Sequence, residues 1–134
     1  MEEDYKVLTG AVFHKFYEKA FQKKYHGRWS VTLDSLKQMC KRIETVYGLE
    51  LCDEIKKVDN RRLLKIDFAV AKSGESPKTS GCRLIAVSDD DDKTIEMLIV
   101  YCKSDIEHIN SNETLAWKAL VSTEYPEHRS LVTQ

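Results

Sequence analysis

The strongest pattern in the sequence is a pair of apolar runs separated by four aspartates. Arg83–Val87 and Thr94–Tyr101 are dominated by Ile, Val, Leu and Tyr, the residue types that suit a pleated and largely buried surface. Asp89–Asp92 cannot be buried together, so the chain must turn in water between the two runs. The stretch therefore predicts a β-hairpin, which fixes the fold class without fixing the function.

Two amphipathic helices are predicted ahead of this hairpin. From Ala11 to Tyr25 the apolar side chains recur at helical spacing and form one core-facing stripe: Phe13, Phe16, Tyr17, Ala20 and Phe21. Gly27 lies where a C-terminal cap would end this helix. A second helix, capped by Ser30 or Thr32, is predicted to run to about Tyr47.

The segments between and around these elements give weaker patterns. Tyr5–Leu8 is a short β-prone run and predicts an opening strand, whereas Leu49–Lys57 carries apolar residues four apart and suggests one or two helical turns. Leu63–Val70 alternates apolar and polar residues and predicts a strand. Lys72–Ser80 has the composition of a mobile loop.

After the hairpin, one more helix is predicted. Glu113–Val121 carries apolar residues and can be capped by Ser111 or Asn112, and Tyr125–Gln134 is expected to fray. The helix needs an apolar surface. We expect that surface to be the second face of the hairpin, formed by Ile85, Val87, Ile95, Met97 and Ile99.

The element order β-α-α-β-β-β predicts an α+β fold, in which two N-terminal helices pack on an antiparallel sheet and a helix follows at the C-terminus. A chain of 134 residues can bury roughly two thirds of its unfolded surface. We therefore expect one domain over residues 1–134, with a core of about 5–109 and a C-terminal helix and tail over 110–134.

Composition narrows the possible classes. The net charge is −1, so a broad nucleic-acid-binding face is not indicated and any such role must depend on a local patch. No apolar run reaches the length of about 18 residues that a membrane span requires, and the start MEEDYK is acidic, unlike a secretion signal. We expect a cytoplasmic protein without membrane partners.

The four cysteines show no CxxC pair and no histidine at zinc-ligand spacing, so reduced, buried thiols are expected. One hairpin register places Cys82 opposite Cys102, close enough to oxidise under stress, although a reducing cytoplasm would keep both as thiols. The same register places Arg83 beside Tyr101. Lys103 then lies on the same face.

Lys65 and Asp67 would share that face if the strand Leu63–Val70 is the next one in the sheet. Lys65, Arg83 and Lys103 would then form one cationic spot on an otherwise balanced molecule.

The element order resembles that of the RelE/ParE superfamily of bacterial toxins. The likeness lies in the stretches Leu64–Asp67 (LKID), Gly81–Ile85 (GCRLI) and Ile99–Ile106 (IVYCKSDI), and it covers roughly residues 5–109. The resemblance implies a ribosome-dependent mRNA endonuclease that an antitoxin protein holds inactive. On the ParE branch it implies instead a protein that poisons DNA gyrase without cleaving anything.

The sequence also departs from the pattern of that superfamily. Cys82 stands where an aromatic residue is common, and Asp67 stands where a second lysine is often found. No tyrosine lies just past Lys103, although His108 is close by. A relative of the fold that has lost its activity is therefore a third possibility.

Cleavage of RNA without a metal needs a base for the 2′-hydroxyl, cations for the phosphate and an acid for the leaving oxygen. The arginine fork suits the phosphate and the two lysines add charge. His108 or Asp67 is a candidate base, and His108 or Tyr101 a candidate proton donor. The complete candidate set is Lys65, Asp67, Arg83, Tyr101, Lys103 and His108.

Each candidate also has a purely structural interpretation. Arg83 can simply pair with Asp67, His108 can be a solvated loop residue, and the lysines can be surface charges. Asp89–Asp92 suggests a calcium loop but lacks the glycine and the distal glutamate of an EF-hand. Phosphate-binding loops, nucleophile elbows and HExxH are absent from the sequence, and no cofactor is expected.

Overall fold

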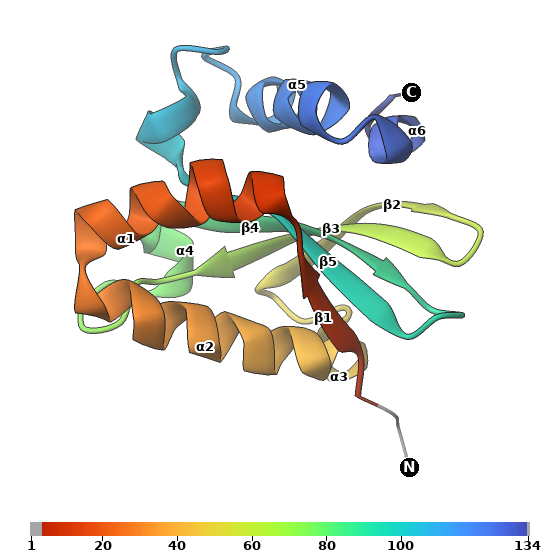
Figure 1. Cartoon of the computed structure of the whole chain (residues 1–134), viewed down its shortest axis with the longest axis horizontal. Helices are drawn as coiled ribbons and strands as arrows, with labels where there is room; N and C mark the ends of the chain where they lie inside the picture. Colours follow the sequence, from red (N-terminus) through yellow and green to blue (C-terminus); the bar gives the residue numbers. More distant parts are fainter. Residues whose placement is uncertain (1–3, 134) are drawn as a thin grey trace.

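The computed structural model describes residues 4–133 and places helices on both faces of one sheet (Figure 1). In chain order the elements are β1 (Lys6–Thr9), the π-helical segment η1 (Phe13–Glu18), α1 (Lys19–Tyr25), α2 (Gly27–Lys41), α3 (Ile43–Val46), β2 (Cys52–Val58), β3 (Arg61–Phe68), α4 (Pro77–Ser80), β4 (Cys82–Asp89), β5 (Thr94–Cys102), the 3-10 turn η2 (Lys103–Ile106), α5 (Glu113–Glu124), the 3-10 turn η3 (Pro126–His128) and α6 (Arg129–Val132). The predicted α+β class is confirmed. No helix in residues 4–133 is long and apolar enough to cross a membrane.

The sheet has the strand order β1-β5-β4-β3-β2. β3, β4 and β5 pair antiparallel, as predicted, and β2 adds a further antiparallel strand; β1 pairs parallel with β5, so the sheet is mixed. The chain between β1 and β5 contains the N-terminal helices and the strands β2, β3 and β4, so it is easily long enough for the crossover that a parallel pair requires.

The segment predicted as helical turns, Leu49–Lys57, instead contributes the edge strand β2. The prediction was wrong because its two apolar residues, four apart, are separated by a bulge between Glu54 and Lys56 rather than by a helical turn. Because side chains alternate along a strand, Cys52 joins the core on one face of the sheet and Ile55 packs on the other. The charged residues along β2 suit an exposed edge strand.

The hairpin has the predicted register at its open end, where Cys82 pairs with Cys102 and Arg83 with Tyr101. The register then shifts by one residue after Ile85. This bulge turns Ile95 and Met97 toward α2, so the prediction that they face the last helix was wrong. The helix packs instead on a face that includes Leu63, Ile85, Val87, Leu98 and Ile99.

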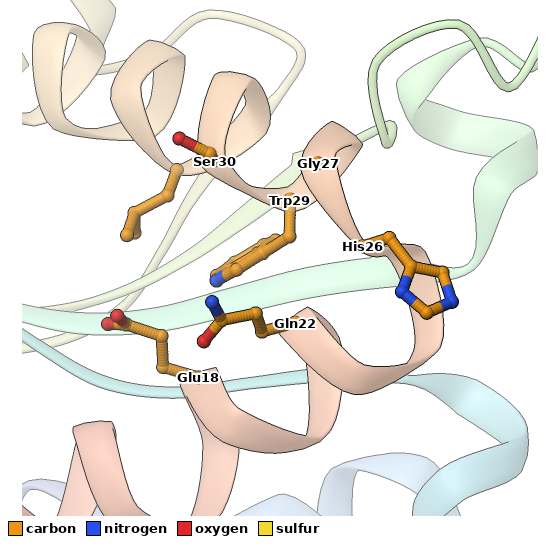
Figure 2. A pocket seen from close by; sticks show the side chains of 7 residues that line it. Glu18, Gln22, His26, Gly27, Trp29 and Ser30 are labelled. Atoms are coloured by element: carbon orange, nitrogen blue, oxygen red, sulfur yellow. The ribbon is translucent and has the colours of Figure 1, made fainter.

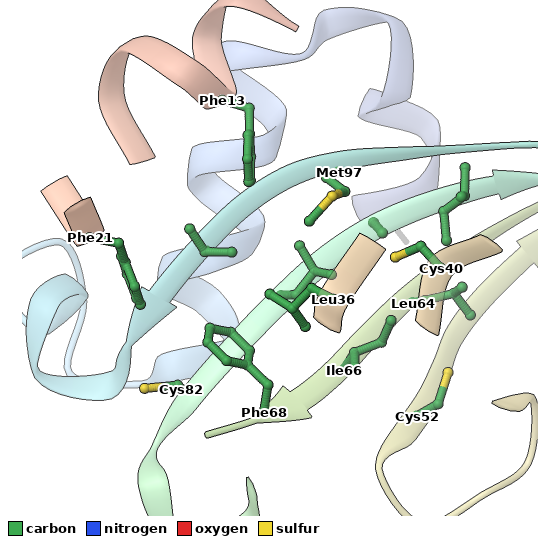
Figure 3. Close-up of a cluster of buried hydrophobic side chains, with 14 of the residues drawn as sticks. Phe13, Phe21, Leu36, Cys40, Cys52, Leu64, Ile66, Phe68, Cys82 and Met97 are labelled. Atoms are coloured by element: carbon green, nitrogen blue, oxygen red, sulfur yellow. The ribbon is translucent and has the colours of Figure 1, made fainter. Parts of the chain in front are cut away.

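The first core lies between the sheet and the N-terminal helices (Figure 3). Phe21 of α1, Trp29 of α2 and Phe68 of β3 form its aromatic centre, with ring centroids 4.9 Å apart for Phe21 and Trp29 and 6.1 Å apart for Phe21 and Phe68. Both predicted helical regions are present, but their bounds differ. His26 adopts the positive φ of 51° that Gly27 was expected to take, and α2 begins at Gly27. The predicted caps Ser30 and Thr32 therefore lie inside α2, which ends at Lys41 before the short α3.

The second core lies under the C-terminal helices. Trp117 of α5 is fully buried there, and the Tyr125 hydroxyl donates to the carbonyl oxygen of Leu98, the extra residue of the bulge, at 2.6 Å. Leu131 and Val132 are also buried. The prediction that Tyr125–Gln134 frays was therefore wrong for residues 125–133, while residue 134 lies outside the described part. Apolar burial holds this short tail in place.

The two cysteines at the hairpin's open end meet closely. Because Lys103 N donates to Gly81 O at 3.0 Å, the next pair, Cys82 and Cys102, is not bridged by backbone hydrogen bonds and its side chains approach most closely. The two Sγ atoms are 2.9 Å apart and both are free thiols. The contact with Cys82 and the Tyr25 hydroxyl lower the pKa of the Cys102 thiol below its usual value.

We predict that a mild thiol oxidant such as diamide converts Cys82 and Cys102 to a disulfide before it oxidises Cys40 or Cys52. Burial raises the pKa of Cys40 to about 12 and that of Cys52 to about 11, so these two thiols are far less nucleophilic. Peptide mapping by mass spectrometry should show the Cys82–Cys102 cross-link with loss of two hydrogens. Cys82→Ser should abolish it, and a first cross-link between other cysteines contradicts the prediction.

The C-terminal layer should contribute strongly to stability. We expect Trp117→Ala to lower the free energy of unfolding by about 3–5 kcal/mol, because it removes a fully buried indole. Leu115→Ala on the same helix is the matched control, since Leu115 is 54% exposed, and should change stability by about 0.5 kcal/mol or less. Urea unfolding measures both, and equal effects of the two substitutions would exclude a docked α5.

Candidate functional site

Five of the six predicted site residues lie on the sheet face that α5 covers. Asp67, Arg83 and Tyr101 are direct neighbours across β3, β4 and β5, so they form one row. Lys65 lies two residues before Asp67 on the same face, and Lys103 follows β5 directly. The structure therefore brings Lys65, Arg83 and Lys103 to one side of the sheet, as the sequence predicted.

Arg83 is buried in this row, with only 5% of its surface exposed. Its Nε lies 3.0 Å from Oδ1 of Asp67. Its Nη1 donates to the carbonyl oxygens of Cys82 at 2.8 Å and Pro77 at 3.2 Å, and its Nη2 donates to Lys78 O at 3.3 Å. The structural interpretation of Arg83 as a partner of Asp67 is confirmed, and both terminal nitrogens are engaged by backbone carbonyls.

Glu113, the first residue of α5, joins the remaining polar side chains. The Tyr101 hydroxyl donates to its Oε2 at 2.6 Å. Lys65 Nζ lies 3.4 Å from the same oxygen, and Lys103 Nζ lies 3.9 Å from Oε1. One carboxylate thus interacts with a phenol and two ammonium groups from three different segments. We call Lys65, Tyr101, Lys103 and Glu113 the Glu113 cluster.

The cluster sets the protonation states of its two central groups. Burial opposes ionisation of Glu113, but the Tyr101 hydroxyl and the Lys65 ammonium outweigh it, so the pKa of Glu113 lies below its usual range. Burial and the neighbouring Glu113 carboxylate both raise the pKa of Tyr101. At neutral pH the cluster therefore holds a carboxylate that can accept a proton beside a phenol that can donate one.

Access to the cluster is uneven. The Lys103 side chain is 54% exposed, whereas those of Glu113 and Lys65 are 22% and 19% exposed. Tyr101 is buried beneath α5. Solvent therefore reaches the cluster from the Lys103 side, and α5 covers Lys65 and Tyr101.

His108 is the predicted site residue that the structure sets apart. It follows η2, is exposed, and lines a groove that Tyr101 also lines, but it is not among the partners of the Glu113 carboxylate. Sequence reasoning missed Glu113 because an acidic residue in the first turn of a helix is explained by the helix dipole alone. The sequence signal that could have pointed to Glu113 was its position directly after the cap residue Asn112, whose side chain accepts a hydrogen bond from Leu115 N.

Two other polar groupings offer no comparable chemistry. In the hollow between α1 and α2, the Gln22 amide lies beside the buried indole nitrogen of Trp29, and Glu18 is engaged by His14 at 2.9 Å (Figure 2). At the far end of the sheet, His128 uses Nε2 toward Glu96 at 2.8 Å and Nδ1 toward Arg61 at 2.6 Å. With a guanidinium already present, this second group is an ion-pair network rather than a cation site.

We predict that Glu113 makes the docking of α5 dependent on pH. A carboxyl whose pKa is lower in the folded state stabilises above its unfolded pKa of about 4.3, and this contribution is lost as the pH falls through the folded value. Glu113→Gln should therefore destabilise the protein at pH 7 but much less at about pH 3. Urea unfolding at both pH values measures this, with Glu107→Gln as an exposed control, and an equal loss at both would argue against it.

No protein-family model matches the chain, and no curated protein matches its sequence significantly. Among solved structures, the chain is similar to the archaeal RelE–RelB complex from Pyrococcus horikoshii OT3, with a TM-score of 0.50 and 15% sequence identity. The similarity covers 74% of this chain and 94% of that chain. At this identity the likeness concerns the fold, so the chain has a RelE-like α+β fold.

Proposed function

We propose that this protein is the toxin of a toxin–antitoxin pair and that it cleaves mRNA on the ribosome at the sheet face under α5. The observation that carries the proposal is the convergence of Lys65, Tyr101 and Lys103 on Glu113. The RelE-like fold supports it, because the similar solved structure is a complex of RelE with RelB. By analogy, we assign an antitoxin protein as the partner.

The protonation states of the cluster suit cleavage without a metal. In this mechanism the Glu113 carboxylate takes the proton of the RNA 2′-hydroxyl, and the resulting oxygen attacks the adjacent phosphorus. Lys65 and Lys103 stabilise the negative charge that develops on the phosphate. The 5′-oxygen then leaves with the proton of Tyr101, whose raised pKa keeps it protonated beforehand, and a 2′,3′-cyclic phosphate remains.

The other predicted candidates take different places in this scheme. Asp67 and Arg83 pair with each other, and Arg83 lies opposite Tyr101 in the sheet, so we assign them as positioning residues. His108 is exposed at the neighbouring groove and is the alternative proton donor if RNA enters from that side. Since Tyr101 is buried, α5 has to move for RNA to reach the phenol.

A second candidate function is non-catalytic inhibition of a protein target such as DNA gyrase. The engagement of Arg83 by backbone carbonyls favours it, because this guanidinium offers no free fork to a phosphate. Purified protein that inhibits gyrase supercoiling and leaves translation untouched would select this function. Ribosome-dependent cleavage of mRNA would select the first.

The nuclease assignment predicts the behaviour of single variants. We expect Lys65→Ala and Lys103→Ala each to lower the rate of mRNA cleavage on ribosomes by about 100-fold and to relieve growth arrest, because the charge on the phosphate is then less stabilised. Lys41→Ala, an exposed lysine of α2, is the matched control and should leave both unchanged. Full cleavage by a Lys65→Ala, Lys103→Ala double variant that folds normally would rule the assignment out.

A further inference from the structure

The first helical segment leaves part of its apolar stripe uncovered. The sequence predicts Phe16 and Ala20 on the core face, but both are exposed, Phe16 by 55%. The π-helical turns of η1 place Phe13 in the core and keep Tyr17 packed against it, while Phe16 faces outward. The chain therefore carries apolar side chains at helical spacing that none of its own described elements covers.

These side chains border a groove of about 520 Å³ between the first helical segment, the end of β5 and the C-terminal layer. The side chains that line it are mostly apolar or aromatic; the others are Lys24 and Asp105, which lie 3.8 Å apart, and His108. Ile109, which follows η2 in the chain, also lines the groove and is 38% exposed. An apolar channel of this kind fits the apolar face of a helix better than a small polar ligand, which needs several buried polar contacts.

A ridge of lysines runs beside the groove. Lys15, Lys19 and Lys23 line an adjoining hollow together with Phe16 and Ala20, and no acidic side chain in the described chain lines that hollow. Lys15 Nζ lies 5.6 Å from the centroid of the Phe16 ring. At 1.5 Å of rise per residue, the ridge is about 12 Å long, which matches two turns of a second helix.

We propose that the groove and the lysine ridge together bind an amphipathic helix from a partner protein, with its apolar face in the groove and an acidic face against the lysines. Apolar burial supplies affinity, and the opposite charges set the orientation and speed association. A nucleic acid would satisfy the lysines but would leave Phe16, Ile109 and Leu120 uncovered. Under the proposed function, on which only this identification rests, the helix belongs to the antitoxin.

The test uses the full chain labelled with ¹⁵N and two synthetic helical peptides of about 20 residues. One peptide carries leucines at i, i+3, i+4 and i+7 on one face and glutamates on the other, and the second carries lysines in place of the glutamates. We expect the acidic peptide to shift the amide signals of Phe16, Ala20, Ile109 and Leu120, and to bind at least tenfold more tightly than the basic one.

Two variants separate the charge and apolar contributions. The double substitution Lys19→Glu, Lys23→Glu should weaken binding of the acidic peptide at least tenfold and strengthen that of the basic one. Ile109→Asp should weaken both. Lys41→Glu on α2 is the control for net charge and should leave binding nearly unchanged.

Equal affinity for the two peptides, amide shifts that lie elsewhere, or preferential binding of poly(U) RNA at the ridge would each overturn the proposal. The docking surface and the toxin function fail separately. Peptide binding that persists in a protein without nuclease activity would leave the docking surface standing, whereas nuclease activity in a protein that binds neither peptide would remove the docking surface alone.

Discussion

The register of β4 against its two neighbours is the constraint on which the site depends. It places Asp67, Arg83 and Tyr101 in one row and turns all three toward the C-terminal layer. A slip of one residue on β4 would turn Arg83 into the apolar core formed with α1 and α2. The arginine resists this slip, because its ion pair with Asp67 on β3 requires the two residues to lie opposite each other.

The C-terminal helix has two roles on that face, and one residue links them. Trp117 and Val121 bury the apolar half of the face, while Glu113 at the start of the same helix neutralises much of its cationic half. Without the carboxylate, Lys65 would lie half-buried with no partner charge, which is costly. The arrangement that stabilises the fold is thus also the one that keeps Tyr101 covered.

Much of this architecture could be predicted from sequence, and the failures have specific physical causes. The hairpin, the two N-terminal helices and the shared face of Lys65, Arg83 and Lys103 follow from periodicity and register. β2 was mistaken for helix because a bulge separates two apolar residues at a spacing that both structures allow. Phe16 was placed in the core because an ideal helical period cannot anticipate π-helical turns. Glu113 was missed because its role arises only when distant segments meet.

The parallel pairing of β1 with β5 has a consequence for how the molecule folds. Lys6 of β1 pairs with Thr94 of β5, which lies far along the chain, whereas β4 and β5 follow each other directly in sequence. Because closing a long loop costs more chain entropy than closing a short one, the hairpin is expected to form early and β1 to add late. The edge strand β1 is then the part of the sheet with the fewest contacts to residues near it in sequence. Its amide protons should exchange with solvent before those of β4.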